Sequence, residues 1–215
     1  MAKSHPTLYL IGLTGNIACG KSTVLAMLSA LSARTLDADR VTHRLQQPGT
    51  SVYQQIVAAF GSQVATAPNS PLDRRKLGEI VFSDPAALAR LERIVHPAVH
   101  TELRAWLSEV ARSSGHGTRE QPRSSPVAVI DAIKLLESGW KDEANAIWVV
   151  TCTPQQQLDR LMATRGMPRA EAERRIAAQS PQAEKVAQAN VVIDNSGSQA
   201  ATRAQVEAAW GKIAH

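Results

Sequence analysis

The chain has 215 residues, which allows one domain with a real hydrophobic core and perhaps a small inserted subdomain. Its hydrophobic share of 44% and charged share of 20% are those of an ordinary globular protein. The formal net charge of +5 suits a protein that binds polyphosphates. However, the basic residues are dispersed and aromatic residues make up only 4%, which disfavours nucleic acid as a partner.

The cysteines and the N-terminal segment predict the compartment. Cys19 and Cys152 lie far apart in the sequence and form no metal-binding pattern, which fits a reducing cytosol. The N-terminal residues lead directly into an apolar segment without the core of a signal peptide, and no apolar run approaches transmembrane length. We therefore predict a cytoplasmic protein with no membrane partner. Its oligomeric state, monomer or small homo-oligomer, is left open.

The first half of the chain predicts one buried strand, a second strand end and then helices. An apolar run over 8–15 predicts the strand, and apolar spacing over 22–33 predicts a helix. Residues 34–39 predict the end of a second strand that delivers two acidic side chains. Further helices are predicted from 41 to the break at Pro48, and over 52–60, 73–82, 84–96 and 97–111, with a turn at 68–71.

The second half alternates strands and helices. A Gly/Pro/Ser-rich segment over 112–126 predicts a mobile surface loop. Strands are predicted at 127–132, 146–152 and 191–197, and helices at 154–162, 168–179 and from 200. The alternation predicts an α/β, doubly wound parallel sheet of about five strands. We expect one domain with its core at about 7–40, 127–153 and 186–215, a helical acceptor region at 41–111 and a helical lid at 154–180.

Residues 15–22 form a phosphate-binding loop motif, Gly15-x-x-x-x-Gly20-Lys21-Ser22, placed between the first strand and a helix. Glycines let successive backbone N–H groups point at one anion, and the helix adds its positive end. Lys21 should reach the outer phosphates, and the Ser22 hydroxyl should be a ligand of Mg²⁺. The predicted nucleotide-binding residues are Gly15, Asn16, Ile17, Ala18, Cys19, Gly20, Lys21, Ser22 and Thr23. We treat Cys19 as a spacer whose backbone N–H matters more than its sulfur.

Two acidic residues and a set of arginines suggest phosphoryl transfer. Asp37 and Asp39 follow a strand predicted to end beside the loop, where one carboxylate could take the proton of an attacking hydroxyl. We favour Asp39 for this role, and Asp37 is equally well a helix cap or a solvated acid. Five arginines lie in the predicted lid, and we expect about two to touch the ligand: Arg160, Arg165, Arg169, Arg174 and Arg175. Of these we favour Arg160 and Arg165, which flank a turn.

The motifs exclude some classes of nucleotide-binding protein. The Asn-Lys-x-Asp guanine reader of GTPases is absent from the sequence. The small size and the arginine-rich helical pair favour a small-molecule kinase that uses ATP. Rival hypotheses are a kinase for a nucleoside monophosphate or another small alcohol, and a nucleotide-sensing module without catalysis. The presence of Lys21, Ser22 and Asp39 argues against the second rival.

Beyond the loop, the sequence closely resembles the dephospho-CoA kinase family over nearly its whole length. The resemblance is carried in order by residues 12–23, 37–39, 48–50, 72–82, 94–97, 136–139, 157–160 and 193–195. It implies transfer of the γ-phosphate of ATP, with Mg²⁺, to the ribose 3′-hydroxyl of dephospho-CoA, the last step of coenzyme A synthesis. It also implies that Asp39 is the base, that Arg160 is a lid arginine, and that Asn195 to Gly197 form the turn beside the adenine.

Two departures from the family pattern affect the predicted site. Ile133-Lys134-Leu135 replaces the usual Pro-Leu-Leu, which brings Lys134 near the expected acceptor or leaves it in solvent. In the lid, Thr164 occupies a position that is commonly arginine, with Arg165 beside it.

Several weaker candidates complete the predicted site. We count Thr14, Arg75, His96 and Lys134 as candidate acceptor contacts. A solvated helix face is the alternative for Arg75 and its neighbours Arg74 and Lys76, and a helix junction is the alternative for His96. Asp131, at the end of a predicted buried strand, is either an acid that orients magnesium or a strand-end cap.

Overall fold

A computed structural model describes residues 8–67, 69–113, 125–133, 135–136 and 139–213. The chain divides into two compact units: a sheet unit, formed by the residues up to Asp37 and from Glu109 onward, and a helical unit, Ala38–Ser108. Among the described residues, no helix combines the length and the apolar character needed to cross a membrane.

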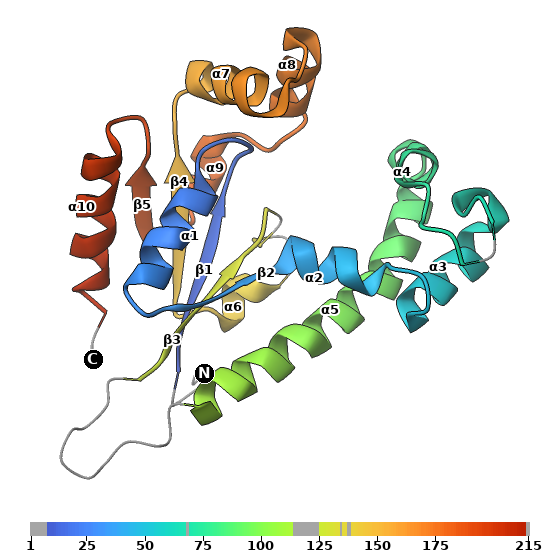
Figure 1. Ribbon diagram of the computed structural model, residues 1–215, viewed down its shortest axis with the longest axis horizontal. Helices are drawn as coiled ribbons and strands as arrows, with labels where there is room; N and C mark the ends of the chain where they lie inside the picture. The colour runs from blue at the N-terminus through green and yellow to red at the C-terminus, as the bar shows by residue number, and fades with distance from the viewer. Residues whose placement is uncertain (1–7, 68, 114–124, 134, 137–138, 214–215) are drawn as a thin grey trace. The chain divides into compact units, whose positions relative to one another are not determined.

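The sheet unit contains five parallel strands in the order β2-β3-β1-β4-β5 (Figure 1). They are β1 (Tyr9–Gly15), β2 (Arg34–Asp37), β3 (Val127–Asp131), β4 (Ala146–Thr151) and β5 (Val191–Asp194). The central strands are almost continuous runs of buried apolar residues, as expected where helices cover both faces of a parallel sheet. The predicted doubly wound α/β sheet is therefore confirmed.

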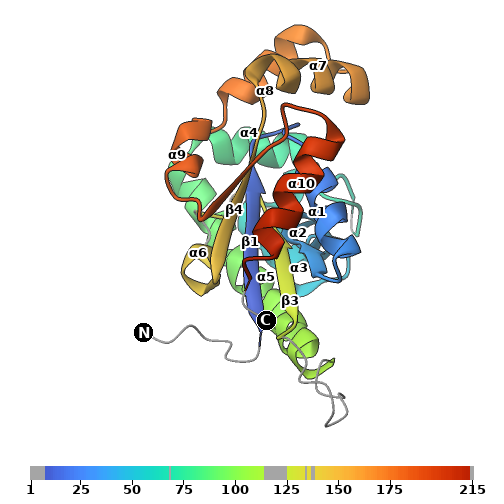
Figure 2. The ribbon, with the colours of Figure 1, turned by 90° about the vertical axis from the view of Figure 1, so that its left-hand side faces the viewer.

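Helices cover both faces of this sheet. Figure 2 shows α1 (Lys21–Ala30) and α10 (Gln199–Trp210) on one face, and α6 (Trp140–Glu143) and α9 (Gln182–Val186) on the other. The hydrophobic core lies between α1, α10 and the strands, and Trp148 is its largest fully buried side chain. α1 packs on α10, so the helix that follows the phosphate loop is held by the C-terminal helix.

Two further helices, α7 (Pro154–Arg165) and α8 (Arg169–Ala177), pack on each other beyond the carboxyl ends of β1 and β4 (Figures 1 and 2). Thr153 starts α7 with a capping box, because its side chain and that of Gln156 each bond the other's backbone N–H. Gly166, with φ +59°, ends α7 in the left-handed conformation that glycine adopts without strain. The predicted helical pair is thus present, and it extends a few residues beyond the predicted end of its first helix.

The helical unit contains α2 (Ala38–Leu45), α3 (Ser51–Phe60), a 3₁₀ turn η1 (Ser62–Val64), α4 (Arg74–Ser83) and most of α5 (Pro85–Ser113). Polar side chains cap three of these helices: Thr50 accepts from Tyr53 N, Asp73 from Lys76 N and Asp84 from Ala86 N. The bond from Lys76 N lowers the pKa of the exposed Asp73 carboxyl. Residues 69–71 form a loop, as predicted, and Pro68 lies outside the described residues.

Two predicted boundaries were wrong. The helices expected at 84–96 and 97–111 are one helix, α5, with Pro97 in its interior. Proline removes one hydrogen bond and costs about 3 kcal/mol there. The buried positions Val95, Val99 and Leu103 continue through it at four-residue spacing, and each contributes about 1.5–3 kcal/mol of burial. The burial free energy of these three side chains therefore exceeds the cost of the proline.

The second wrong boundary concerns the paired acids. β2 ends at Asp37, and Asp39 lies in the first turn of α2 rather than on the strand. An acid in the first turn of a helix is favoured by the helix dipole, so the sequence begins a helix where the strand was expected to continue. The short elements η1, α6 and α9 were not predicted. Of the loop expected at 112–126, residues 114–124 lie outside the described part of the chain.

Candidate functional site

The loop between β1 and α1 turns tightly because its conformation excludes side chains at two positions. A Cβ atom on Gly15 would lie 2.4 Å from the Val150 backbone oxygen. Gly20 has φ +94°, and a Cβ there would lie 2.0 Å from Asn195 Nδ2. Ala18 also has a positive φ of 59°, which is uncommon for a residue other than glycine. This is the strained, compact backbone that a phosphate-binding loop requires.

The carbonyl groups of three consecutive loop residues each accept a hydrogen bond from a side chain outside the loop. Gln157 Nε2 donates to Ile17 O at 2.8 Å. Arg160 Nη1 donates to Ala18 O at 3.2 Å, and Asn195 Nδ2 donates to Cys19 O at 2.8 Å. Because these carbonyls are bound from outside, they do not compete with an anion for the loop's interior.

The start of α1 offers positive charge to such an anion. α1 begins at Lys21 after Gly20, with no side-chain cap and no acid in its first turn. The Lys21 and Ser22 N–H groups have no acceptor among the described residues, as is general for the first turn of a helix. The Ser22 side chain is exposed and that of Lys21 is half-buried. This helix end is therefore open to phosphate oxygens.

The tip of the loop is also docked on α7 and α8. Ile17 N donates to Gln179 Oε1 at 2.7 Å, and Asn16 Nδ2 donates to Ser180 O at 3.3 Å. Ile17 and Ala18 pack against the small apolar cluster formed by Leu158, Leu161 and Ala172. Asn16 is buried, and its Oδ1 has no donor among the described residues. The helices predicted as the lid are thus bonded to the phosphate loop.

Among the five arginines of the predicted lid, only Arg160 donates a hydrogen bond to the phosphate loop. Its Nη2 donates to Asn195 O at 2.9 Å in addition to the bond with Ala18 O. Arg169 and Arg175 form exposed ion pairs within α8, with Glu173 and Glu171, and such pairs contribute little energy. Arg165 and Arg174 are exposed on α7 and α8, as is Thr164.

The Asn195 side chain is bonded to the phosphate loop, and the predicted place of this residue beside the adenine stays a prediction. Its side chain is buried, donating to Cys19 O and accepting from Thr202 Oγ1 at 2.9 Å. It therefore ties the loop to α10. Gly197 is exposed in the turn before α10, where a nucleotide base could approach it. The Asn195 amide group therefore positions the loop.

Acidic residues lie at the carboxyl edge of the sheet, near the strand that leads into the loop. Asp37 and Asp131 are register partners at the ends of β2 and β3, and Leu13 of β1 is the next partner of Asp131. Carboxylate and hydroxyl oxygens are the ligand type that Mg²⁺ prefers, so Asp131 and Ser22 are candidates to hold this ion. Among the described residues, no group of three or more His, Cys, Asp or Glu side chains is placed to hold a metal ion.

The remaining predicted acceptor contacts have varied surroundings. Thr14 is fully buried and donates to Ile133 O at 3.2 Å, which indicates a structural role for its hydroxyl. Arg75 is exposed and pairs with Glu79 at 3.1 Å one helical turn away, as the solvated-face alternative predicts. His96 is exposed within α5 rather than at a helix junction. Lys134 lies outside the described residues.

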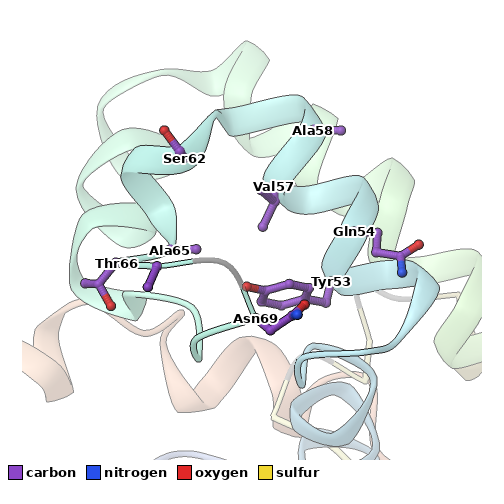
Figure 3. A pocket seen from close by; sticks show the side chains of 9 residues that line it. Tyr53, Gln54, Val57, Ala58, Ser62, Ala65, Thr66 and Asn69 are labelled. Atoms are coloured by element: carbon purple, nitrogen blue, oxygen red, sulfur yellow. The ribbon is translucent and has the colours of Figure 1, made fainter.

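The helical unit contains an open pocket of about 630 Å³ beside α3 (Figure 3). Tyr53 and Val57 of α3 line it together with Ala65 and Asn69 of the following segment. Tyr53 is fixed by a 2.7 Å bond from its hydroxyl to Ser70 O. No lining side chain is charged, so this pocket suits an uncharged chain rather than phosphate groups.

The network around Asn195 generates a prediction. Asn195→Ala would leave Cys19 O without its side-chain donor, and the Thr202 hydroxyl would keep only its longer bond to Ser198 O. We expect the free energy of unfolding to fall by about 1–3 kcal/mol. We also expect the Kd for ATP to rise roughly ten-fold, equivalent to about 1.4 kcal/mol. Chemical denaturation and titration calorimetry measure these changes.

Ser196→Ala is the matched control, because the bonds recorded for Ser196 involve only its backbone. This variant should leave both quantities near their original values. An Asn195→Ala protein that binds ATP as tightly as the original chain would contradict the positioning role.

Comparisons with known proteins identify the family. Residues 9–201 match the family model described as "Dephospho-CoA kinase". A dephospho-CoA kinase from Symbiobacterium thermophilum is 46% identical over 94% of this chain and 80% of its own length. One from Geobacter sulfurreducens is 42% identical over 94% of this chain and 98% of its own length.

A solved structure agrees with the sequence matches. The crystal structure of TT1252 from Thermus thermophilus has a TM-score of 0.78 and 30% identity, covering 96% of this chain and 98% of that one. The phosphate loop at the carboxyl edge of a five-stranded parallel sheet is the P-loop kinase fold. The chain is therefore a kinase, and it belongs to the dephospho-CoA kinase family.

Proposed function

We propose that this chain transfers the γ-phosphate of ATP to the ribose 3′-hydroxyl of dephospho-CoA, giving coenzyme A and ADP. The observation that supports this most directly is the phosphate loop. Its three outward carbonyls are bound by side chains, and it leads into the open, positive end of α1. The acceptor is inferred from the family, and the binding site for the donor is inferred from the loop.

In this mechanism the charged groups around the loop stabilise the transferred phosphoryl group. Lys21 contacts the outer phosphates, and the α1 N-terminus binds their oxygens. Mg²⁺, when bound, would neutralise phosphate charge, held by Ser22 and by the Asp131 carboxylate at the end of β3. The Arg160 guanidinium, already beside the loop, adds positive charge where the transition state spreads its negative charge.

The proposed base is Asp39. It follows the end of β2 by two residues, and the carboxyl end of β2 belongs to the sheet edge that carries the loop. A carboxylate there accepts the proton of the 3′-hydroxyl as that oxygen attacks the γ-phosphorus. Asp37, the last residue of β2, is the alternative base.

We further propose that the helical unit binds the acceptor, through its uncharged pocket. Dephospho-CoA carries a long uncharged arm with two amide groups beyond its phosphates. The pocket combines apolar surface at Val57 and Ala65 with the amide groups of Gln54 and Asn69, which match such an arm. As a kinase of coenzyme A synthesis, the protein is predicted to act in the cytoplasm.

An ADP-release assay with purified protein tests the proposed reaction. We expect ADP to appear only when ATP, Mg²⁺ and dephospho-CoA are all present, with coenzyme A as the second product by mass spectrometry. EDTA in excess should abolish turnover, because the phosphate charge is then left unneutralised. Faster turnover with a nucleoside monophosphate or another small alcohol would instead support the rival kinase. ATP binding without turnover on any acceptor would support the nucleotide-sensing module.

Asp39→Asn tests the base. We expect this variant to fold and to bind ATP normally, with kcat reduced about 10²- to 10⁴-fold, because the amide cannot accept the proton. Asp37→Asn is the matched control, and its kcat should stay within a few-fold of the original. If Asp37→Asn lost turnover and Asp39→Asn kept it, the base would be Asp37.

Val57→Phe tests the acceptor pocket, because the larger ring narrows it from the α3 side. We expect the KM for dephospho-CoA to rise about ten-fold, equivalent to about 1.4 kcal/mol, with the KM for ATP unchanged. Gln55→Phe places the same ring on the exposed side of α3 as a control. An unchanged KM for dephospho-CoA in Val57→Phe would remove the pocket from acceptor binding.

A further inference from the structure

Two cysteines that the proposed mechanism does not use meet at the phosphate loop. Cys19 follows β1 within the loop, and Cys152 follows β4, the strand that pairs with β1. Their Sγ atoms lie 3.1 Å apart, and the residues are 0% and 3% exposed. They are the only cysteines in the chain, and both are free thiols. The sequence separation of these residues had suggested no such contact.

The surroundings give the two sulfurs different roles. The Cys152 thiol donates to Cys19 Sγ, and this bond lowers the pKa of Cys19 and raises that of Cys152. The positive charges of Lys21 and Arg160 further lower the pKa of Cys19, while burial opposes them. The short contact between the sulfurs and the nearby cations therefore favour Cys19 over Cys152 as the attacking sulfur.

We propose that Cys19 and Cys152 form an oxidative modification site, which hydrogen peroxide converts to a disulfide that weakens nucleotide binding. A disulfide bond is about 2.05 Å long, so the sulfurs need to approach by only about 1 Å. Both side chains are shielded from solvent, so the site selects a small neutral oxidant over bulky disulfides such as oxidised glutathione.

The reaction balances with peroxide as the only oxidant. The Cys19 thiolate attacks one peroxide oxygen, forming a sulfenic acid and releasing hydroxide. Cys152 sulfur then attacks the sulfenic sulfur; its proton and the leaving hydroxide give water, and the S–S bond forms. In total, two thiols and one H₂O₂ give one disulfide and two waters. A dithiol reductant reverses the step by thiol–disulfide exchange.

The disulfide acts on the nucleotide site through the loop backbone. Cys19 lies between Ala18, which has a positive φ, and Gly20, and its carbonyl is bound by Asn195. Drawing its sulfur toward the end of β4 moves the backbone that leads into the free N–H groups of Lys21 and Ser22 at the start of α1. Misplacing groups by about 1 Å in catalytic sites lowers the reaction rate by up to about 100-fold. Bound ATP, in turn, places negative charge beside the Cys19 thiolate and disfavours it, so ATP should slow the oxidation.

Peptide mapping of the full-length protein after peroxide treatment tests the site. We expect a cross-link between the tryptic peptides 4–21 and 142–160, with the loss of two hydrogens, and slower cross-linking in the presence of ATP. Oxidised glutathione should give no cross-link in the folded protein. Peroxide treatment that yields only sulfinic acid or methionine sulfoxide, without this cross-link, would overturn the proposal.

Calorimetry with ATP measures the consequence without depending on the acceptor. We expect the oxidised protein to bind ATP at least ten-fold more weakly, with full recovery after dithiothreitol. Cys152→Ser is the control, because it should bind ATP normally when reduced. On peroxide treatment, this variant should give a Cys19 sulfenic acid that dimedone traps. Continued treatment should cause a loss of ATP binding that dithiothreitol does not reverse. A fully cross-linked protein with an unchanged Kd for ATP would overturn the regulatory part of the proposal.

Discussion

The phosphate loop depends on hydrogen bonds that it cannot make within itself. Its N–H groups must face an anion, so its carbonyls must face away, where they would be buried without partners. Gln157, Arg160 and Asn195 supply those partners to three consecutive carbonyls. An unsatisfied buried carbonyl costs about 1–3 kcal/mol, so these three side chains can outweigh the strain of Ala18 in its left-handed conformation. The donors come from α7 and from the turn after β5, so the loop carbonyls are satisfied only once these two elements are in place.

The same arrangement sets the electrostatics of the site. Lys21 and Arg160 and the start of α1 all place positive charge at the loop, and no acid lies in the first turn of α1 to offset it. This local charge is unfavourable until a polyphosphate binds, and it also favours the thiolate of Cys19. The acids at the ends of β2 and β3 lie on the side of β1 opposite to β4, where they can serve a cation or a proton without cancelling the loop's field.

The sequence predicted the elements of the site better than the contacts between them. The loop motif, the parallel sheet and the helical pair follow from local spacing of apolar residues and glycines. The bonds from Gln157, Gln179 and Asn195 join residues more than a hundred positions apart, and local periodicity carries no information on such pairs. One clue was available, because Gln157 interrupts the apolar face that Leu158 and Leu161 form on α7, and a polar residue there needs a buried partner. Two local predictions were wrong. Pro97 was expected to separate two helices, but burial keeps α5 continuous through it. Asp39 was expected at the end of a strand, but it lies in the first turn of α2.

The bonding of the loop tip to α7 and α8 links nucleotide binding to the lid. Ile17 N donates to Gln179 Oε1, so a phosphate oxygen that takes this N–H must displace the Gln179 side chain. The bond lost is between neutral groups and contributes about 1 kcal/mol. A bond from the same N–H to a charged phosphate is roughly twice as strong, so the exchange favours the nucleotide. Gln179 lies just past the end of α8, and its release removes one of the contacts that hold this helix on the loop. When a phosphate takes this N–H, α8 therefore loses one bond to the loop, whereas the bonds of Arg160 on α7 to Ala18 O and Asn195 O do not involve this group.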